Sequence, residues 1–125
     1  MREEIEIRLP AEPDQLSLLR TVAGAIAMRA DFDLDAIADL KIAVDEACSM
    51  LIMQAAKGAV LRCTFGTDED GIVVQSEVAT DGNEPLDDTA FGWHVLSTLT
   101  DESSWTRSEA GVCLRLSLQR KVNNS

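Results

Sequence analysis

Apolar and polar residues alternate in several short stretches of this chain, a pattern typical of half-buried β-strands. Residues 3–9 place apolar side chains on one side and mostly charged side chains on the other. Extended segments also recur four times further along the chain: residues 59–65, 72–79, 103–107 and 112–118. Turn residues at 66–71, including Asp70-Gly71, and at 109–111 predict antiparallel hairpins.

Helical periodicity marks three other segments, which are residues 16–30, 34–55 and 91–100. The second is the longest, and Asp33 before it is a residue type that caps helices well. Its apolar positions form one broad stripe: Leu34, Ile37, Leu40, Val44, Ala47, Cys48, Leu51 and Ala55. Asp39, Glu46 and Met53 share a line off this stripe. That mixed face suits a ligand or partner surface better than plain solvent.

The element order is therefore strand, helix, helix, strand, strand, helix, strand, strand. Hairpin strands with helices available to cover one face predict an α+β fold. We expect a two-layer sandwich of a mixed, mostly antiparallel sheet with three helices on one face. No linker or repeat interrupts the pattern, so residues 1–120 are expected to form a single domain and residues 121–125 a flexible tail.

The charge of the chain restricts its partners. With 125 residues and a formal net charge of −11, it lacks the clusters of Lys and Arg that phosphates require, so nucleic acid and anionic membranes are not expected. The negative charge favours a basic protein partner. The alternative explanation of this charge is that it only keeps the protein soluble. The charged, alternating start is not a signal peptide, and no apolar run could span a membrane, so a cytoplasmic location is expected.

The three cysteines, Cys48, Cys63 and Cys113, are far apart and each sits among apolar residues. There is no Cys-x-x-Cys pair and no His at metal spacing, so neither zinc binding nor a redox motif is predicted. All three are expected to be buried, reduced thiols.

No single residue gives strong evidence of a catalytic or binding role. Glu46 on a helix is ordinarily a solvated charge, and Asp81-Gly82 is ordinarily a turn. Gly92 near a helix start could bring backbone N–H groups to an anion, although a loop-to-helix junction explains it equally well. The order of these residues along the chain is more informative than any one of them.

That order resembles the RsbW/SpoIIAB anti-sigma factor family, which has the Bergerat (GHKL) ATP-binding fold. The resemblance covers nearly the whole chain and is closest to the actinobacterial anti-sigma-F branch, RsbW/UsfX. Three segments carry it: Leu18-Leu19-Arg20-Thr21, Asp39-Leu40-x-x-Ala43-Val44-Asp45-Glu46 and Phe91-x-Trp93-His94-Val95-Leu96.

The resemblance implies roles for particular residues. Glu46 occupies the position of the glutamate that promotes transfer of the ATP γ-phosphate to a serine of an anti-anti-sigma protein. Asp81 and Gly82 correspond to the adenine-binding pair, and Gly92 to the last glycine of the lid motif. Arg20 corresponds to an arginine that meets both partner proteins, although a solvated arginine is the simpler interpretation.

The chain departs from the family pattern around the phosphates. Met50 stands where the family has the Asn that holds Mg²⁺, and a thioether is a poor ligand for a hard cation. Ala90 replaces a glycine of the lid motif, and a second glycine is lost after Gly82. The lid, residues 83–89, is short and carries three carboxylates that would repel a triphosphate: Glu84, Asp87 and Asp88.

Two functions follow from the resemblance and its departures. The first is an anti-sigma factor that sequesters an alternative, stress-type (SigF/SigB-like) sigma factor. It would be a homodimer released by an anti-anti-sigma (STAS) protein, with a degenerate ATP site. The second is an active ATP-dependent serine kinase of the same family, which would require ATP with Mg²⁺. An unrelated enzyme on this fold is disfavoured because no intact phosphate-binding motif is present.

Overall fold

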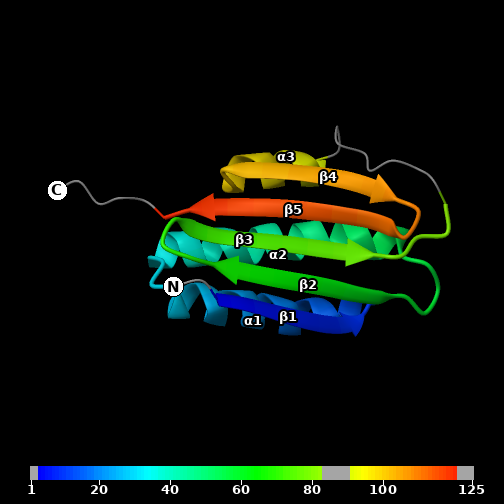
Figure 1. Cartoon of the computed structure of the whole chain (residues 1–125), viewed down its shortest axis with the longest axis horizontal. Helices are drawn as coiled ribbons and strands as arrows, with labels where there is room; N and C mark the ends of the chain where they lie inside the picture. Colours follow the sequence, from blue (N-terminus) through cyan, green and yellow to red (C-terminus); the bar gives the residue numbers. More distant parts are fainter. Residues whose placement is uncertain (1–2, 83–90, 121–125) are drawn as a thin grey trace.

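A computed structural model describes residues 3–82 and 91–120 and shows two layers, a sheet and a set of helices that covers one of its faces (Figure 1). The strands are β1 (Glu3–Pro10), β2 (Val60–Thr67), β3 (Gly71–Val78), β4 (Glu102–Ser108) and β5 (Gly111–Gln119). The helices are the 3-10 turn η1 (Pro13–Gln15) and the α-helices α1 (Leu16–Arg29), α2 (Leu34–Gln54) and α3 (Phe91–Leu99).

The five strands lie in the order β1-β2-β3-β5-β4, and every pairing is antiparallel. The predicted α+β sandwich, with its helices on one face, is confirmed, while the described sheet contains no parallel pair. The 3-10 turn was not predicted. It follows from Pro13, whose fixed φ suits the first position of a helical turn.

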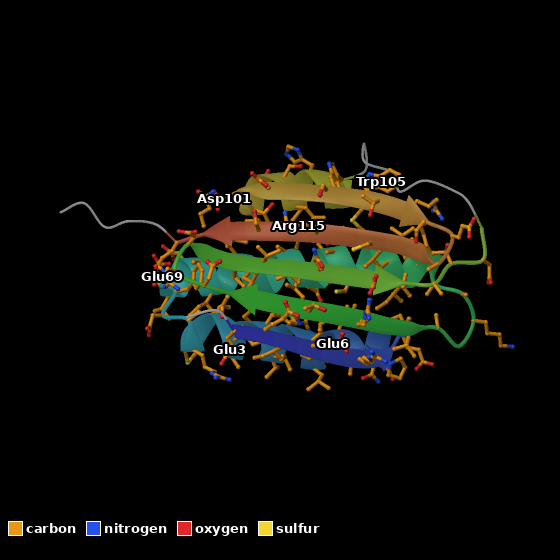
Figure 2. All side chains as sticks on the ribbon, in the orientation of Figure 1. Glu3, Glu6, Glu69, Asp101, Trp105 and Arg115 are labelled. Carbon is orange, nitrogen blue, oxygen red and sulfur yellow. The ribbon has the colours of Figure 1, made fainter. Side chains whose placement is uncertain are left out.

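Alternation along the strands decides which side chains face the helices. The helix-facing side is apolar, as in β5, where Val112, Leu114, Leu116 and Leu118 are buried. By register, Trp105 of β4 shares this side with Leu114. Glu6 and Arg115 lie on the opposite side, which faces the viewer in Figure 2. The sheet therefore has one face in the core and one polar face.

Helix α2 lies at the centre of the helix layer and contacts both α1 and α3. Its buried stripe follows the predicted spacing: Leu40, Ala43, Val44, Ala47, Cys48 and Leu51. The Asp33 side chain accepts a 2.8 Å hydrogen bond from the Ala36 N–H, which confirms the predicted cap. The helix ends at Gln54, close to the predicted end.

A sharp reversal joins α1 to α2. Asp31 has a φ of 61°, a left-handed conformation that few residues other than Gly adopt. This lets the Phe32 N–H reach back to the Ala27 carbonyl at 3.1 Å, as in a Schellman end. Asp is tolerated there because its short polar side chain suits this conformation.

The β2–β3 hairpin has a shorter turn than the sequence predicted. Residues 66–71 were expected to be turn, but β2 continues to Thr67 and β3 begins at Gly71. The Asp68 carboxylate closes the turn by accepting hydrogen bonds from the N–H groups of Asp70 and Gly71 at 2.8 and 3.1 Å. The predicted hairpin is present, but an Asx-type turn at Asp68 closes it in place of the expected Asp70-Gly71 turn.

Candidate functional site

Glu46 and Gly92 lie together where α3 meets α2. A methyl group on Gly92 would come within 3.4 Å of the Met50 sulfur and still closer to the Glu46 carboxylate. The missing side chain therefore lets the start of α3 lie directly against the face of α2 that carries both residues. Residues separated by more than forty positions in the sequence therefore meet here, and the roles that the resemblance implies for them stay a prediction.

The donor set at this junction does not suit magnesium. Mg²⁺ takes oxygen ligands in near-octahedral geometry, and Glu46 supplies carboxylate oxygens while Met50 supplies only a thioether. Across the described ranges 3–82 and 91–120, no group of three or more His, Cys, Asp and Glu side chains is placed to hold a metal ion. Among the described residues, Glu46 supplies a carboxylate that can accept a proton or meet a partner, and Met50 adds no oxygen ligand beside it.

Asp81 and Gly82 follow β3 at the C-terminal end of α2, away from Glu46. The eight residues from Glu46 to Gln54 correspond to about 12 Å of helix. The exit of β3 is tied to the end of α2 by a 2.8 Å hydrogen bond from the Ala56 N–H to the Ala79 carbonyl. The Asp81 side chain is exposed. The described residues therefore place the candidate adenine pair and Glu46 at separate points along α2.

Arg107 of β4 binds the segment around Gly82 to the end of α2, and the sequence did not predict this role. Its Nη1 donates to the Gly82 carbonyl at 2.9 Å and to the Thr80 hydroxyl at 3.2 Å, while Nη2 donates to the Gln54 side-chain oxygen at 3.4 Å. Its Nε is buried without a hydrogen-bond partner among the described residues. The available signal was alternation in β4, which puts Arg107 on the same side as Trp105 and so requires polar partners there.

Arg20 is exposed, as expected, but it is not a lone solvated arginine. Its Nη1 lies 3.4 Å from Asp45 Oδ1, which joins α1 to α2 beside Glu46. Asp45 Oδ1 is itself buried and accepts no hydrogen bond from the described residues. Arg20 therefore neutralises a carboxylate on α2, and the part of its guanidinium that faces solvent stays available to a partner.

Ala90 and the short acidic lid, residues 83–89, were singled out in the sequence but lie outside the described residues. The predicted tail, residues 121–125, lies outside them as well. The departures expected there stay predictions.

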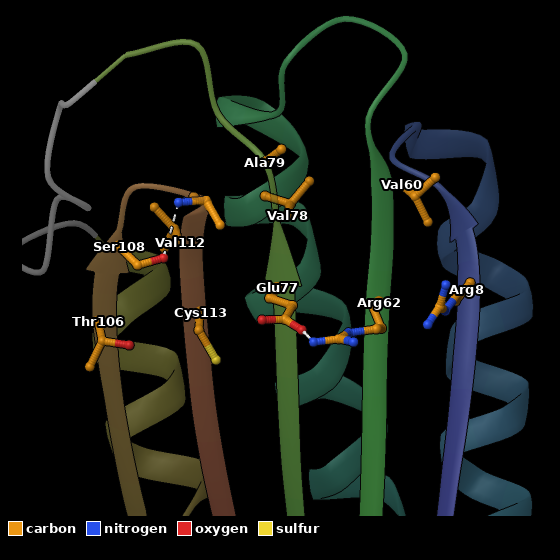
Figure 3. A pocket seen from close by; sticks show the side chains of 12 residues that line it. Arg8, Val60, Arg62, Glu77, Val78, Ala79, Thr106, Ser108, Val112 and Cys113 are labelled. Atoms are coloured by element: carbon orange, nitrogen blue, oxygen red, sulfur yellow. Dashed lines mark hydrogen bonds and ion pairs between the residues drawn. The ribbon is translucent and has the colours of Figure 1, made fainter.

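Two hollows in the structure lie away from Glu46. The first, about 320 Å³, is on the polar sheet face, and Figure 3 shows Arg8, Arg62 and Glu77 lining it. Arg62 forms an ion pair with Glu77, so this hollow contains compensated charge. The second, about 480 Å³, lies near Glu3 and Arg29, which are paired at 2.9 Å. Neither hollow involves the residues that the resemblance identifies.

A small polar cluster lies within the apolar core beneath Glu46. The sulfurs of Cys48 and Cys63 are 3.8 Å apart, and the Ser76 hydroxyl donates to Cys63 at 3.3 Å. The hydrogen bond to Cys63 and burial raise the pKa of Cys48, whereas the hydrogen bonds that Cys63 receives lower its own pKa. Cys113, expected to be buried, is only half-buried because it faces outward from β5; partial burial raises its pKa.

The described helices include none that is both long and apolar enough to cross a membrane. His94 is exposed on α3, and Trp93 packs partly against the core.

Comparison with known proteins identifies the family of this chain. The histidine kinase-like ATPase domain matches residues 9–118. Anti-sigma-F factor RsbW of Mycobacterium tuberculosis (strain CDC 1551 / Oshkosh) is 41% identical over 98 residues, which cover 78% of this chain and 58% of that protein. Serine-protein kinase RsbW of Bacillus cereus (strain ATCC 10987 / NRS 248) is 30% identical over 120 residues, with coverages of 80% and 75%. The chain thus spans less than two thirds of the M. tuberculosis relative.

Proposed function

The chain belongs to the histidine kinase-like ATPase domain family and to its RsbW group, and we propose that it is an anti-sigma factor. In this proposal it binds an alternative, stress-type sigma factor in the cytoplasm and keeps it from the transcription machinery. An anti-anti-sigma STAS protein releases the sigma factor, the chain acts as a homodimer, and residues 1–120 form its one domain.

The similarity to a protein named anti-sigma-F factor RsbW is the observation that carries this proposal. Charge supports it independently. Sigma factors bind DNA and so expose basic surfaces, and a chain with a net charge of −11 is complementary to such a surface. Long-range attraction of this kind raises association rates and disfavours nucleic acid as the direct ligand.

We propose further that the ATP site is degenerate. Phosphoryl transfer depends on positioning and on cations that neutralise the developing charge. Met50 offers sulfur at the position of the metal ligand, and Gly92 lies directly against Glu46 and Met50. Glu46 then serves the fold or the partner surface instead of activating a serine hydroxyl.

An active serine kinase is the second candidate, favoured by the names of the Bacillus relatives and by the presence of Glu46 at the α2–α3 junction. In that case Glu46 would accept the proton of the serine hydroxyl, and bound ATP would supply the γ-phosphate and leave as ADP. Nucleotide and metal would have to bind with ligands other than those at Met50.

Three measurements on the purified chain separate these candidates. A pull-down against a panel of purified alternative sigma factors should give one stable complex, and an empty panel would overturn the anti-sigma proposal. Calorimetry with Mg-ATP should show no micromolar binding, and Met50→Asn tests whether an oxygen ligand restores it. Phosphorylation of a STAS protein that is abolished by Glu46→Ala would instead establish the kinase.

A further inference from the structure

Large apolar side chains are exposed on the outer surface of the helix layer. Of the six most exposed large hydrophobic residues in the described ranges, three lie near the α1–α2 turn: Met28 (64% exposed), Leu34 (81%) and Ile42 (51%). Ala38, also exposed, lies between Leu34 and Ile42 along α2. We call these four residues the α1–α2 patch. Single exposed apolar residues are ordinary, whereas a group of this kind marks a surface for interaction.

The four residues of the patch are neighbours in space. Leu34, Ala38 and Ile42 are spaced by four and so follow one line of α2, about 12 Å long. The register of the two helices is set by two contacts: Gly24 faces the Lys41 side chain, and Arg20 pairs with Asp45. From Arg20 to Gly24 the chain advances four residues along α1, while their partners on α2 go back four residues, from Asp45 to Lys41. The two helices are therefore antiparallel.

One further turn in the same register places Met28 abreast of residue 37, next to Ala38. By this register the patch spans both helices. It lies on the opposite side of the molecule from the polar sheet face and its hollow, because the helices cover the other face of the sheet (Figure 1).

Carboxylates surround the patch. Asp31 lies in the turn between the helices, and Asp35 and Asp39 follow one another by one turn along α2. Of the basic residues nearby, Arg29 is paired with Glu3, and the aliphatic part of Lys41 lies over Gly24 on the α1 side. An apolar surface with an acidic rim is complementary to an apolar stripe with basic flanks.

We propose that the α1–α2 patch is the docking surface for a basic amphipathic helix of the protein partner. The inference rests on the proposed function, in which that partner is the sigma factor. A helix is the fitting element because the patch runs along two packed helices and offers contacts at one-turn spacing, as helix-binding surfaces do. The apolar residues bind its stripe, and the aspartates bind Lys and Arg beside it.

Affinity measurements on surface variants test this inference. Ile42→Glu should weaken binding of the purified sigma factor by about tenfold or more, since a charge would be buried in the interface. Met28→Glu, on the other helix, should do the same. The matched control is Val60→Glu, because Val60 is 53% exposed and lies on β2, outside the helix layer; its affinity should stay within about twofold.

The charged rim has its own test. The double variant Asp35→Asn, Asp39→Asn should bind more weakly than the wild type at low salt and should show a flatter dependence on salt concentration, because two of the attracting charges are gone. Thermal unfolding of every variant checks that the fold is intact, since these residues are exposed and contribute little to the core.

The outcomes separate this inference from the proposed function. If the wild type binds no sigma factor, both fail. If the wild type binds and Ile42→Glu and Met28→Glu bind equally well, the docking surface is wrong while the anti-sigma role stands. If these variants change the oligomeric state seen by light scattering and leave sigma affinity unchanged, the patch joins two copies of this chain and the proposed occupant is wrong.

Discussion

At the scale of single residues, two glycines of the same hairpin make opposite demands. A Cβ on Gly71 would lie 2.9 Å from the Gln119 Cα and 3.1 Å from the Leu118 carbonyl carbon, which are backbone atoms that cannot turn aside. A Cβ on Gly66 would meet nothing closer than the Val73 carbonyl oxygen at 3.9 Å. The first position requires glycine because β5 approaches so closely, and the second does not.

Gly71→Ala should therefore lower the free energy of unfolding by about 2–3 kcal/mol, since β3 and β5 must move apart. Gly66→Ala should change it by about 0.5 kcal/mol or less, or stabilise slightly by restricting the unfolded chain. Urea unfolding of both variants measures this difference. Equal losses would show that strand propensity, and not the contact with β5, sets the requirement.

The three cysteines should fall into two classes of thiol reactivity. Cys48 and Cys63 are buried, and only Cys113 is accessible. Native protein should show one rapidly reacting thiol with Ellman's reagent and three after denaturation. Because partial burial raises the pKa of Cys113, its rate should keep rising above the pH at which the rate of an ordinary free thiol levels off. Cys113→Ser should remove the rapid phase, and rapid labelling of Cys48 would contradict the buried cluster.

At the scale of elements, one side chain joins three of them. Arg107 of β4 donates to the segment after β3 at Thr80 and Gly82 and to Gln54 at the end of α2. Arg107→Ala should lower the free energy of unfolding by about 1–3 kcal/mol and should speed hydrogen exchange after β3, because its acceptors lose a partly buried cation.

Arg115→Ala is the matched control for Arg107→Ala. Arg115 is an arginine of the neighbouring strand β5 whose side chain is exposed on the polar face (Figure 2). Its loss should change the free energy of unfolding by about 0.5 kcal/mol or less. If the two variants lose equal stability, the hydrogen bonds of Arg107 do not hold the end of α2.

Local patterns were enough to predict most elements, and contacts between distant segments account for the rest. Alternation and helical spacing identified the five strands and the three α-helices, and Asp33 marked the start of α2 correctly. The β2–β3 turn was predicted too long because Asp68, through side-chain hydrogen bonds, closes it within three residues. Cys113 was misassigned because every residue of a strand has apolar neighbours in the sequence, while only register decides its face.

The candidate site shows the same division. Order along the chain brought Glu46 and Gly92 into one hypothesis, and the α2–α3 contact places them together. Arg107 was missed because its acceptors lie on segments 25 to 53 residues away in the sequence. The partner of Arg20 was missed for the same reason, since Asp45 faces α1 only once the two helices are packed.

At the scale of the whole molecule, 22 acidic and 11 basic residues give two effects of opposite sign when salt is added. Mutual repulsion destabilises the compact fold, and salt screens it as the Debye length falls from about 10 Å at 0.1 M to about 3 Å at 1 M. The unfolding temperature should therefore rise by a few degrees over that range. The same screening removes the attraction to a basic partner, so affinity for the sigma factor should fall by about tenfold or more.

A rise in unfolding temperature together with a fall in affinity for the sigma factor distinguishes electrostatic screening from a general effect of solutes. Sucrose strengthens burial without screening charge, so it should raise the unfolding temperature without lowering the affinity for the sigma factor. Differential scanning fluorimetry and calorimetry on the same samples give both quantities. A complex that tightens with salt would be held by apolar contacts alone, in which case the acidic rim of the α1–α2 patch would have no part in binding.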